Sequence, residues 1–230
     1  MDVKLEKPLA NVGVATVQPT KRNAERQIVT YWIISTIIGV PILYDWLLSW
    51  NVPATLSQPW LVFYLIVSLA LGQTLYILVA RHGGRPIHWG ALSIFAIGNG
   101  IAETFAFAAV YRVGAIIGAA VVGSFAPGAA SFAGFVLGLI FFMIYGGLIH
   151  ALFWMHVLPP HLDDNPRSQR IRKYRPLAEV ALVLGWGLCF WLFEDIWTVI
   201  VLHTIVDIGL MLLVRPAIFG AKEAPTGDRH

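Results

Sequence analysis

Residues 197–214 read WTVIVLHTIVDIGLMLLV, a stretch that is apolar except for two threonines, His203 and Asp207. An α-helix needs about 20 consecutive, mainly apolar residues to cross a hydrocarbon core of about 30 Å. The stretch therefore predicts a membrane-spanning helix that carries two ionisable side chains. The apolar length of the stretch indicates the fold class, and its two ionisable side chains indicate where a site lies.

Five further stretches of the chain have a similar length and apolar character. The 230 residues are 57% hydrophobic and 13% charged, whereas a soluble domain has roughly 25% charged residues. The predicted fold class is therefore all-α, a polytopic membrane helix bundle of about six transmembrane helices. The five other predicted spans are 28–50, 59–80, 87–111, 131–158 and 177–193.

Charge and cysteine content exclude several classes of function. The formal net charge of +3 is small, and the bases form no stripe with interleaved aromatic residues, so we expect no nucleic-acid partner. The single cysteine, Cys189, lies in an apolar stretch. An intrachain disulfide and a cysteine-ligated metal site are therefore both excluded.

The distribution of lysine and arginine predicts the orientation. With the N-terminus in the cytoplasm, 15 of the 16 bases fall on the cytoplasmic side, and Arg112 is the exception. This agrees with the positive-inside rule. We therefore predict a bacterial-type cytoplasmic membrane protein with both termini in the cytoplasm. Its membrane domain covers 28–215, and its two largely disordered tails cover 1–27 and 216–230.

The segment between the third and fourth spans, residues 113–130, is rich in glycine and alanine. A seventh pass here would move the later bases to the outer side, so we predict a re-entrant or surface-lying segment. The pairs Gly114 with Gly118 and Gly134 with Gly138 have the spacing that lets membrane helices approach closely.

The chain has nine tryptophans, and most of them lie near the predicted span ends. An indole ring at a membrane interface keeps its N–H hydrated while its ring stays apolar. We therefore predict interfacial anchoring for Trp32, Trp46, Trp50, Trp60, Trp89, Trp154 and Trp197.

Four ionisable residues lie inside predicted spans: Glu103, His150, His203 and Asp207. Each costs about 2.5–3.5 kcal/mol on insertion scales, so each needs a partner or a function. Asn99, one helical turn before Glu103, is a further polar candidate. Helix counting places Glu103 and His203 at one depth and the other two residues about 6–12 Å deeper. The four side chains can therefore meet in a single polar cavity only if the helices tilt or the predicted helix boundaries shift by one turn.

The spacing of His203 and Asp207 places both side chains on one helix face. We predict that they form a hydrogen-bonded pair, because a carboxylate beside an imidazole fixes its tautomer and favours its charged form.

The stretch from Gly185 to Asp207 resembles the type II CAAX prenyl endopeptidases, also called the CPBP family. Members are multi-helix intramembrane proteins with a Glu-Glu-x-x-x-Arg motif, a Phe-x-x-x-His motif and a final His-x-x-x-Asn or His-x-x-x-Asp. The resemblance covers residues 102–212. It implies an intramembrane endopeptidase site in which the positions that match the motifs are Glu103, His150, His203 and Asp207.

The chain departs from the family pattern at three positions. Ala102 stands where the family has its catalytic glutamate, Phe107 where it has the arginine, and Gly146 where it has the phenylalanine of the second motif. Because two of the three residues of the first motif are replaced, we favour a non-proteolytic pseudoenzyme. Its predicted role is a subunit or scaffold that binds a membrane helix, a lipid or a prenyl chain, in the bilayer and in a complex with other membrane proteins.

Two alternatives remain at this stage. In an active endopeptidase, Glu103 would be the general base with His150 as its partner, and His203 with Asp207 would stabilise the oxyanion. In a third interpretation His150 and His203 bind haem or a metal, although no metal-binding spacing supports it. The sequence predicts no cofactor and leaves a metal ion or a pigment open.

Overall fold

The computed structural model describes residues 21–79, 85–158 and 166–220, and every regular element in these ranges is a helix. The predicted all-α membrane fold class is therefore confirmed in its coarse form. Within these ranges four helical stretches are long and apolar enough to cross a membrane. These candidate spans are Trp89–Gly123, Pro127–Trp154, Pro166–Phe193 and Ile196–Leu213.

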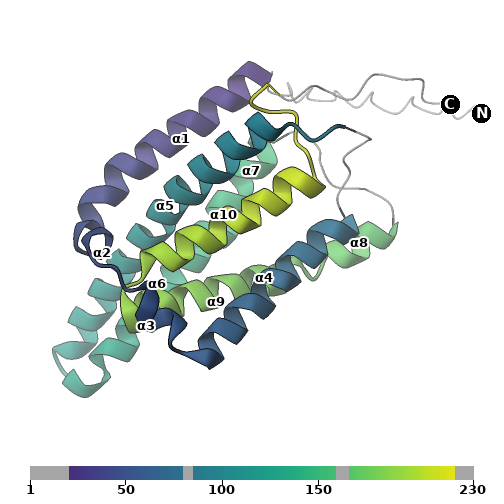
Figure 1. Ribbon diagram of the computed structural model, residues 1–230. Coiled ribbons are helices and arrows are strands. Elements are labelled where there is room, and N and C mark those ends of the chain that lie inside the picture. The colour runs from purple at the N-terminus through teal and green to yellow at the C-terminus, as the bar shows by residue number, and fades with distance from the viewer. Residues whose placement is uncertain (1–20, 80–84, 159–165, 221–230) are drawn as a thin grey trace, which may run out of the picture.

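The helices form two layers (Figure 1). In the first layer α1, α5, α10 and α4 lie side by side in that order, and in the second α6, α7 and α9 pack behind them. The elements are α1 (Lys21–Ile42), α2 (Tyr44–Leu48), α3 (Val52–Leu56), α4 (Pro59–Val79), α5 (Trp89–Gly123), a 3-10 turn (Pro127–Ala129), α6 (Ala130–Phe142), a π-helix (Met143–His150), α7 (Ala151–Val157), α8 (Pro166–Arg172), α9 (Arg175–Phe193) and α10 (Ile196–Leu213).

The predicted re-entrant segment after the third span is wrong, and so is the alternative of a seventh pass. Helix α5 continues without a break for 35 residues, to Gly123. Alanine favours helix, and no proline lies between Trp89 and Ala126. At 1.5 Å per residue α5 is about 52 Å long. Its C-terminal part therefore extends beyond the neighbouring helices as a hairpin with α6 (Figure 1).

Glycines hold this hairpin together, as their spacing predicts. A Cβ atom added to Gly118 would lie 2.6 Å from the carbonyl oxygen of Ala133, and one added to Gly134 would lie 2.8 Å from that of Ala115. Any side chain at these positions would push the two backbones apart. The absence of a Cβ on both helices is what permits their close approach.

The predicted disordered N-terminal tail is wrong for residues 21–27, which form the first two turns of α1. Ala24 and Ile28 are buried in the helix bundle and anchor this part of α1. An apolar residue on each of two successive turns gives the segment a face to bury, so it is ordered. Residues 1–20 lie outside the described part of the chain.

The predicted C-terminal tail is also wrong over its first residues, 216–220. Ile218 is only 1% exposed, and the ring of Phe219 stacks on Trp32 with centroids 5.4 Å apart. The backbone N–H of Phe219 donates a hydrogen bond to the carboxylate of Glu25. These apolar contacts fold the chain back over α1 after α10. The rest of that tail lies outside the described residues.

The one base that the orientation analysis leaves on the outer side, Arg112, has a partner there. Its guanidinium donates two hydrogen bonds to the carboxylate of Asp45 and lies over the ring of Trp46, 5.1 Å from the centroid. The charge of Arg112 is therefore balanced at the end of the bundle where α2 lies.

Candidate functional site

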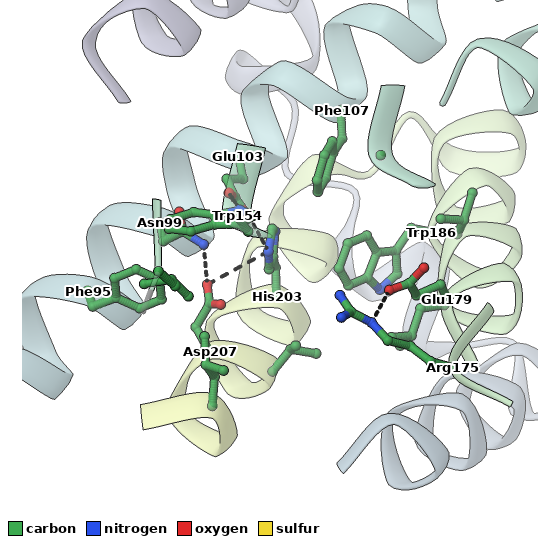
Figure 2. Close-up of a pocket in the computed structure, with 16 residues that line it drawn as sticks. Phe95, Asn99, Glu103, Phe107, Trp154, Arg175, Glu179, Trp186, His203 and Asp207 are labelled. Carbon is green, nitrogen blue, oxygen red and sulfur yellow. Dashed lines mark hydrogen bonds and ion pairs between the residues drawn. The ribbon is translucent and has the colours of Figure 1, made fainter. Parts of the chain in front are cut away.

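Helices α5 and α10 run antiparallel and bring their polar residues together on two levels (Figure 2). On one level Glu103 Oε2 lies 3.2 Å from His203 Nε2. One helical turn away Asn99 Nδ2 donates to Asp207 Oδ2 at 3.0 Å. All four side chains belong to residues that are at most 4% exposed. The register of two antiparallel helices thus joins three of the four predicted ionisable residues.

The predicted hydrogen bond between His203 and Asp207 does not form. His203 Nε2 lies 3.7 Å from Asp207 Oδ2, which is an ion-pair distance for a protonated imidazole and longer than a hydrogen bond. Helical spacing brings the two side chains near each other, but Glu103 on the facing helix lies closer to the imidazole. The carboxylate of Asp207 instead accepts its hydrogen bond from Asn99.

Thr104 determines where one proton of His203 lies. Its hydroxyl donates to the carbonyl oxygen of Gly100 at 2.6 Å and lies 3.1 Å from His203 Nδ1. A hydroxyl has one proton, so this contact requires that Nδ1–H donates to the threonine oxygen. Nε2 therefore faces Glu103 Oε2 with one proton between them, which either the imidazole or the carboxyl group holds.

Two tryptophans that were predicted to be interfacial anchors belong to this polar network. The indole N–H of Trp154, on α7, donates to Glu103 Oε1 at 2.7 Å. The N–H of Trp32, on α1, donates to Asn99 Oδ1 at 2.9 Å. The interfacial prediction is wrong for both residues, because each indole N–H donates to a buried polar side chain of α5 instead of to interfacial water.

The other predicted anchors differ in exposure, and Trp197 is half-buried. Trp46 is also buried, so its interfacial prediction is wrong as well. Trp50, Trp60 and Trp89 each expose more than half of their surface, which interfacial anchoring requires.

Aromatic rings enclose the imidazole of His203. The ring of Phe107 stacks on it with centroids 5.5 Å apart and planes 11° apart, and Trp186 of α9 lies at 4.9 Å. These rings exclude water from two sides of the imidazole. They also strengthen its polar contacts, because the local dielectric constant is low.

The network forms one wall of a cavity of about 150 Å³ that α5, α7, α9 and α10 enclose. At the far side of the cavity Arg175 Nε donates to Glu179 Oε1 at 2.6 Å, and Trp186 lies between this ion pair and His203 (Figure 2). The cavity thus has a deep polar wall, an aromatic middle and a charged outer rim.

The cavity offers two further polar contacts to a ligand. Among the described residues Asp207 accepts a hydrogen bond through Oδ2 only, so Oδ1 has capacity for a donor. The indole N–H of Trp186 is buried and has no partner within the described chain. A buried polar atom without a partner costs about 1–3 kcal/mol, so a ligand that supplies an acceptor to Trp186 would gain binding energy there.

The remaining predicted positions are distributed as follows. His150 ends the π-helix, and its side chain lies outside the described part of the structure, so its predicted role is untested. Ala102 is 3% exposed and supplies no polar group beside Glu103. Gly146 lines the cavity. Thr104 is a site residue that no sequence pattern predicted, although it directly follows Glu103 in the sequence.

Within the described ranges no cluster of three or more His, Cys, Asp or Glu side chains has the geometry to hold a metal ion. A comparison of the chain with family models, with curated proteins and with solved structures finds no match in any of the three. The functional argument therefore rests on the geometry of the cavity itself.

Proposed function

We propose that the chain is a CPBP-like membrane protein of six spans that binds the hydroxyl group of a lipid or isoprenoid alcohol in the polar cavity and does not hydrolyse peptides. Helices α1 and α4 pack beside the four candidate spans and supply the other two crossings. The N-terminal end of α1 and the C-terminal end of α10 lie at the same end of the bundle (Figure 1), which supports one side of the membrane for both termini, and the positive-inside rule assigns that side to the cytoplasm.

The free donor and free acceptor of the cavity carry the proposal for a hydroxyl ligand. A hydroxyl group can donate to Asp207 Oδ1 and can also accept from a donor such as the N–H of Trp186, whereas an ammonium group can only donate. A neutral ligand also avoids the cost of moving a further charge into the membrane. The volume of about 150 Å³ is below the range of about 300–1,000 Å³ typical of drug-sized ligands. The cavity therefore suits a head group rather than a whole lipid.

The engagement of Glu103 argues against hydrolysis. Its two carboxylate oxygens already contact the N–H of Trp154 and the imidazole of His203. Ala102, at the position of the family's catalytic glutamate, has no group that takes a proton from water. A base for peptide hydrolysis needs to lie within hydrogen-bond reach of the attacking water.

An intramembrane endopeptidase is the second candidate, and one observation favours it. Glu103 and His203 lie 3.2 Å apart on the wall of the same cavity, and a carboxylate that shares a proton with an imidazole can act as a general base. In this candidate Glu103 is the base and His203 takes the place of His150 as its partner, with Asp207 one turn away.

The ligand proposal predicts a stabilisation by farnesol of the purified protein in detergent. At 100 times its dissociation constant a ligand adds about 2.7 kcal/mol of stability. For a chain of this size this corresponds to a rise in melting temperature of roughly 5 °C or more. Farnesyl methyl ether, which cannot donate a hydrogen bond, should give a much smaller rise.

Substitution of the proposed donor tests the same site. Trp186→Phe should weaken the response to farnesol, whereas Trp191→Phe, on the same helix but bonded to Ser131 outside the cavity, should retain it. Equal responses to the alcohol and its ether, or in both variants, would contradict the proposal. Cleavage of a prenylated peptide that is lost in Glu103→Gln and His203→Ala would establish the endopeptidase in its place.

The proposed orientation predicts the accessibility of engineered cysteines in intact cells. Tyr174 is 62% exposed between α8 and α9, and Ser57 is exposed at the opposite end of the bundle. An impermeant thiol reagent added outside should modify Ser57→Cys and leave Tyr174→Cys unmodified until the cells are opened. The native Cys189 is buried and gives little background. Modification of Tyr174→Cys from outside would refute the orientation.

A further inference from the structure

Trp32 of α1 acts on the polar cavity from outside it. Its side chain is not among the described residues that line the cavity. Its N–H nevertheless donates to Asn99 Oδ1 at 2.9 Å, and Asn99 Nδ2 in turn donates to Asp207 Oδ2 at 3.0 Å. Asn99 is only 1% exposed, so bulk water does not compete for either bond. The three side chains therefore form one chain of hydrogen bonds that runs from α1 through α5 to α10.

The direction of this chain of hydrogen bonds is fixed at Trp32. An indole N–H can only donate, so it selects the oxygen of the Asn99 amide and turns the amide N–H groups toward Asp207. In the opposite orientation of the amide, two donors would face each other at Trp32, and the amide oxygen would face the carboxylate of Asp207. The amide therefore holds Asp207 through Oδ2 (Figure 2) and leaves Oδ1 as the acceptor for a ligand.

Two contacts hold the indole of Trp32 in place. The backbone of α5 lies against the ring, because a Cβ atom added to Gly98 would lie 2.7 Å from it. The ring of Phe219 stacks on the indole with centroids 5.4 Å and planes 15° apart. Phe219 has a φ of 49°, a left-handed conformation that is uncommon for an aromatic residue and that its hydrogen bond to Glu25 supports. The C-terminal segment 214–220 thus returns to α1 and packs on Trp32 (Figure 1).

We propose that Trp32 is a positioning residue that makes the cavity selective for a hydroxyl group, and that the C-terminal segment 214–220 keeps Trp32 in place. This inference rests on the proposed function and adds the source of its specificity. Without the N–H of Trp32 the orientation of the Asn99 amide is no longer fixed. Asp207 then loses the donor that holds its carboxylate, and the cavity loses its preference for a ligand that donates a hydrogen bond.

The affinities of farnesol and farnesyl methyl ether for the purified full-length protein measure this selectivity. The wild-type protein should bind the alcohol about fivefold more tightly, a factor typical of one hydrogen bond, because only the alcohol donates to Asp207. Trp32→Phe removes the N–H and keeps an aromatic ring, so it should bring this ratio close to one and leave the affinity for the ether unchanged. A merely structural role for Trp32 would weaken both ligands equally and leave the ratio at its wild-type value, which would overturn the inference.

Variants of Phe219 test the role of the C-terminal segment without altering the polar network. Phe219→Leu removes the stacked ring and should lower the ratio of affinities, whereas Phe219→Tyr retains an aromatic ring and should keep the wild-type ratio. The matched control for the tryptophan variant is Trp191→Phe, because the N–H of Trp191 donates to Ser131 outside the cavity. It should also keep the wild-type ratio. An unchanged ratio in Phe219→Leu would refute the role of the C-terminal segment.

A double-mutant cycle separates this inference from the proposed function, because it needs no ligand. In the Trp32→Phe background, Asp207→Ala should lower the melting temperature clearly less than it does in the wild-type protein, because Asn99 no longer presents a fixed donor to the carboxylate. Trp191→Phe and Asp207→Ala should have additive effects. Equal affinities of the wild-type protein for the alcohol and the ether would contradict the proposed function, whereas additive effects of Trp32→Phe and Asp207→Ala would overturn the positioning role of Trp32.

Discussion

The replacement of Asp207 by alanine should destabilise the purified protein in detergent by about 1–3 kcal/mol. The carboxylate is 4% exposed and is the acceptor for the side-chain N–H of Asn99, which is itself 1% exposed. Its removal leaves that N–H without a partner in a low dielectric. The effect should spread to α1, because the same Asn99 side chain accepts the hydrogen bond from Trp32.

Asp45→Ala is the matched control for this prediction, because Asp45 also forms a polar contact between two helices. Its side chain is 59% exposed, so the loss of its ion pair with Arg112 should cost only about 0–1 kcal/mol. Thermal unfolding of the three proteins in one detergent measures the difference, at about 2–4 °C for each kcal/mol. Equal melting temperatures for the two variants would mean that the contact between Asn99 and Asp207 is solvated or absent.

Gly118→Ala should also destabilise the protein strongly, by about 1–3 kcal/mol. The new methyl carbon would lie 2.6 Å from the carbonyl oxygen of Ala133 and 2.9 Å from the Cβ of Leu137. Both are atoms that move only with the backbone, so α5 and α6 would have to separate. This packing cost outweighs the roughly 1 kcal/mol by which alanine favours a helix over glycine.

Gly147→Ala separates packing from helix propensity. Within the described part of the chain, no atom beyond the backbone of its own helix lies within 4 Å of a Cβ placed at Gly147, so this substitution should leave the melting temperature unchanged or raise it. The same thermal unfolding measurement compares the two variants. A loss of stability in Gly147→Ala as large as in Gly118→Ala would show that the close approach of the hairpin helices is not the cause.

Part of the candidate site follows from the sequence because ionisable residues are costly inside a membrane. That cost alone identifies Glu103, His203 and Asp207 as residues that need partners. The partners themselves come from other helices. Threonine and tryptophan are common in membrane helices, so no sequence pattern marks Thr104 or Trp154 as a site residue. Only their placement beside His203 and Glu103 gives them a role.

The ends of the ordered part of the chain are harder to predict from the sequence than the fold class. The first turns of α1 and the segment around Ile218 are polar or short, so neither has the length of apolar sequence that signals a span. Each is ordered because it packs against the other parts of the bundle, and Phe219 stacks on Trp32. Contacts between residues nearly 190 positions apart leave no local signal.

The sequence by itself determined that this protein is a bundle of membrane-competent helices, because a backbone in hydrocarbon has to satisfy its own hydrogen bonds and long apolar stretches can do so only as helices. The tertiary structure alone decided which polar groups pair. His203 meets Glu103 rather than Asp207 because the antiparallel register of α5 and α10 places the two on one level. That register depends on the packing of whole helix faces, and no single stretch of the sequence specifies it.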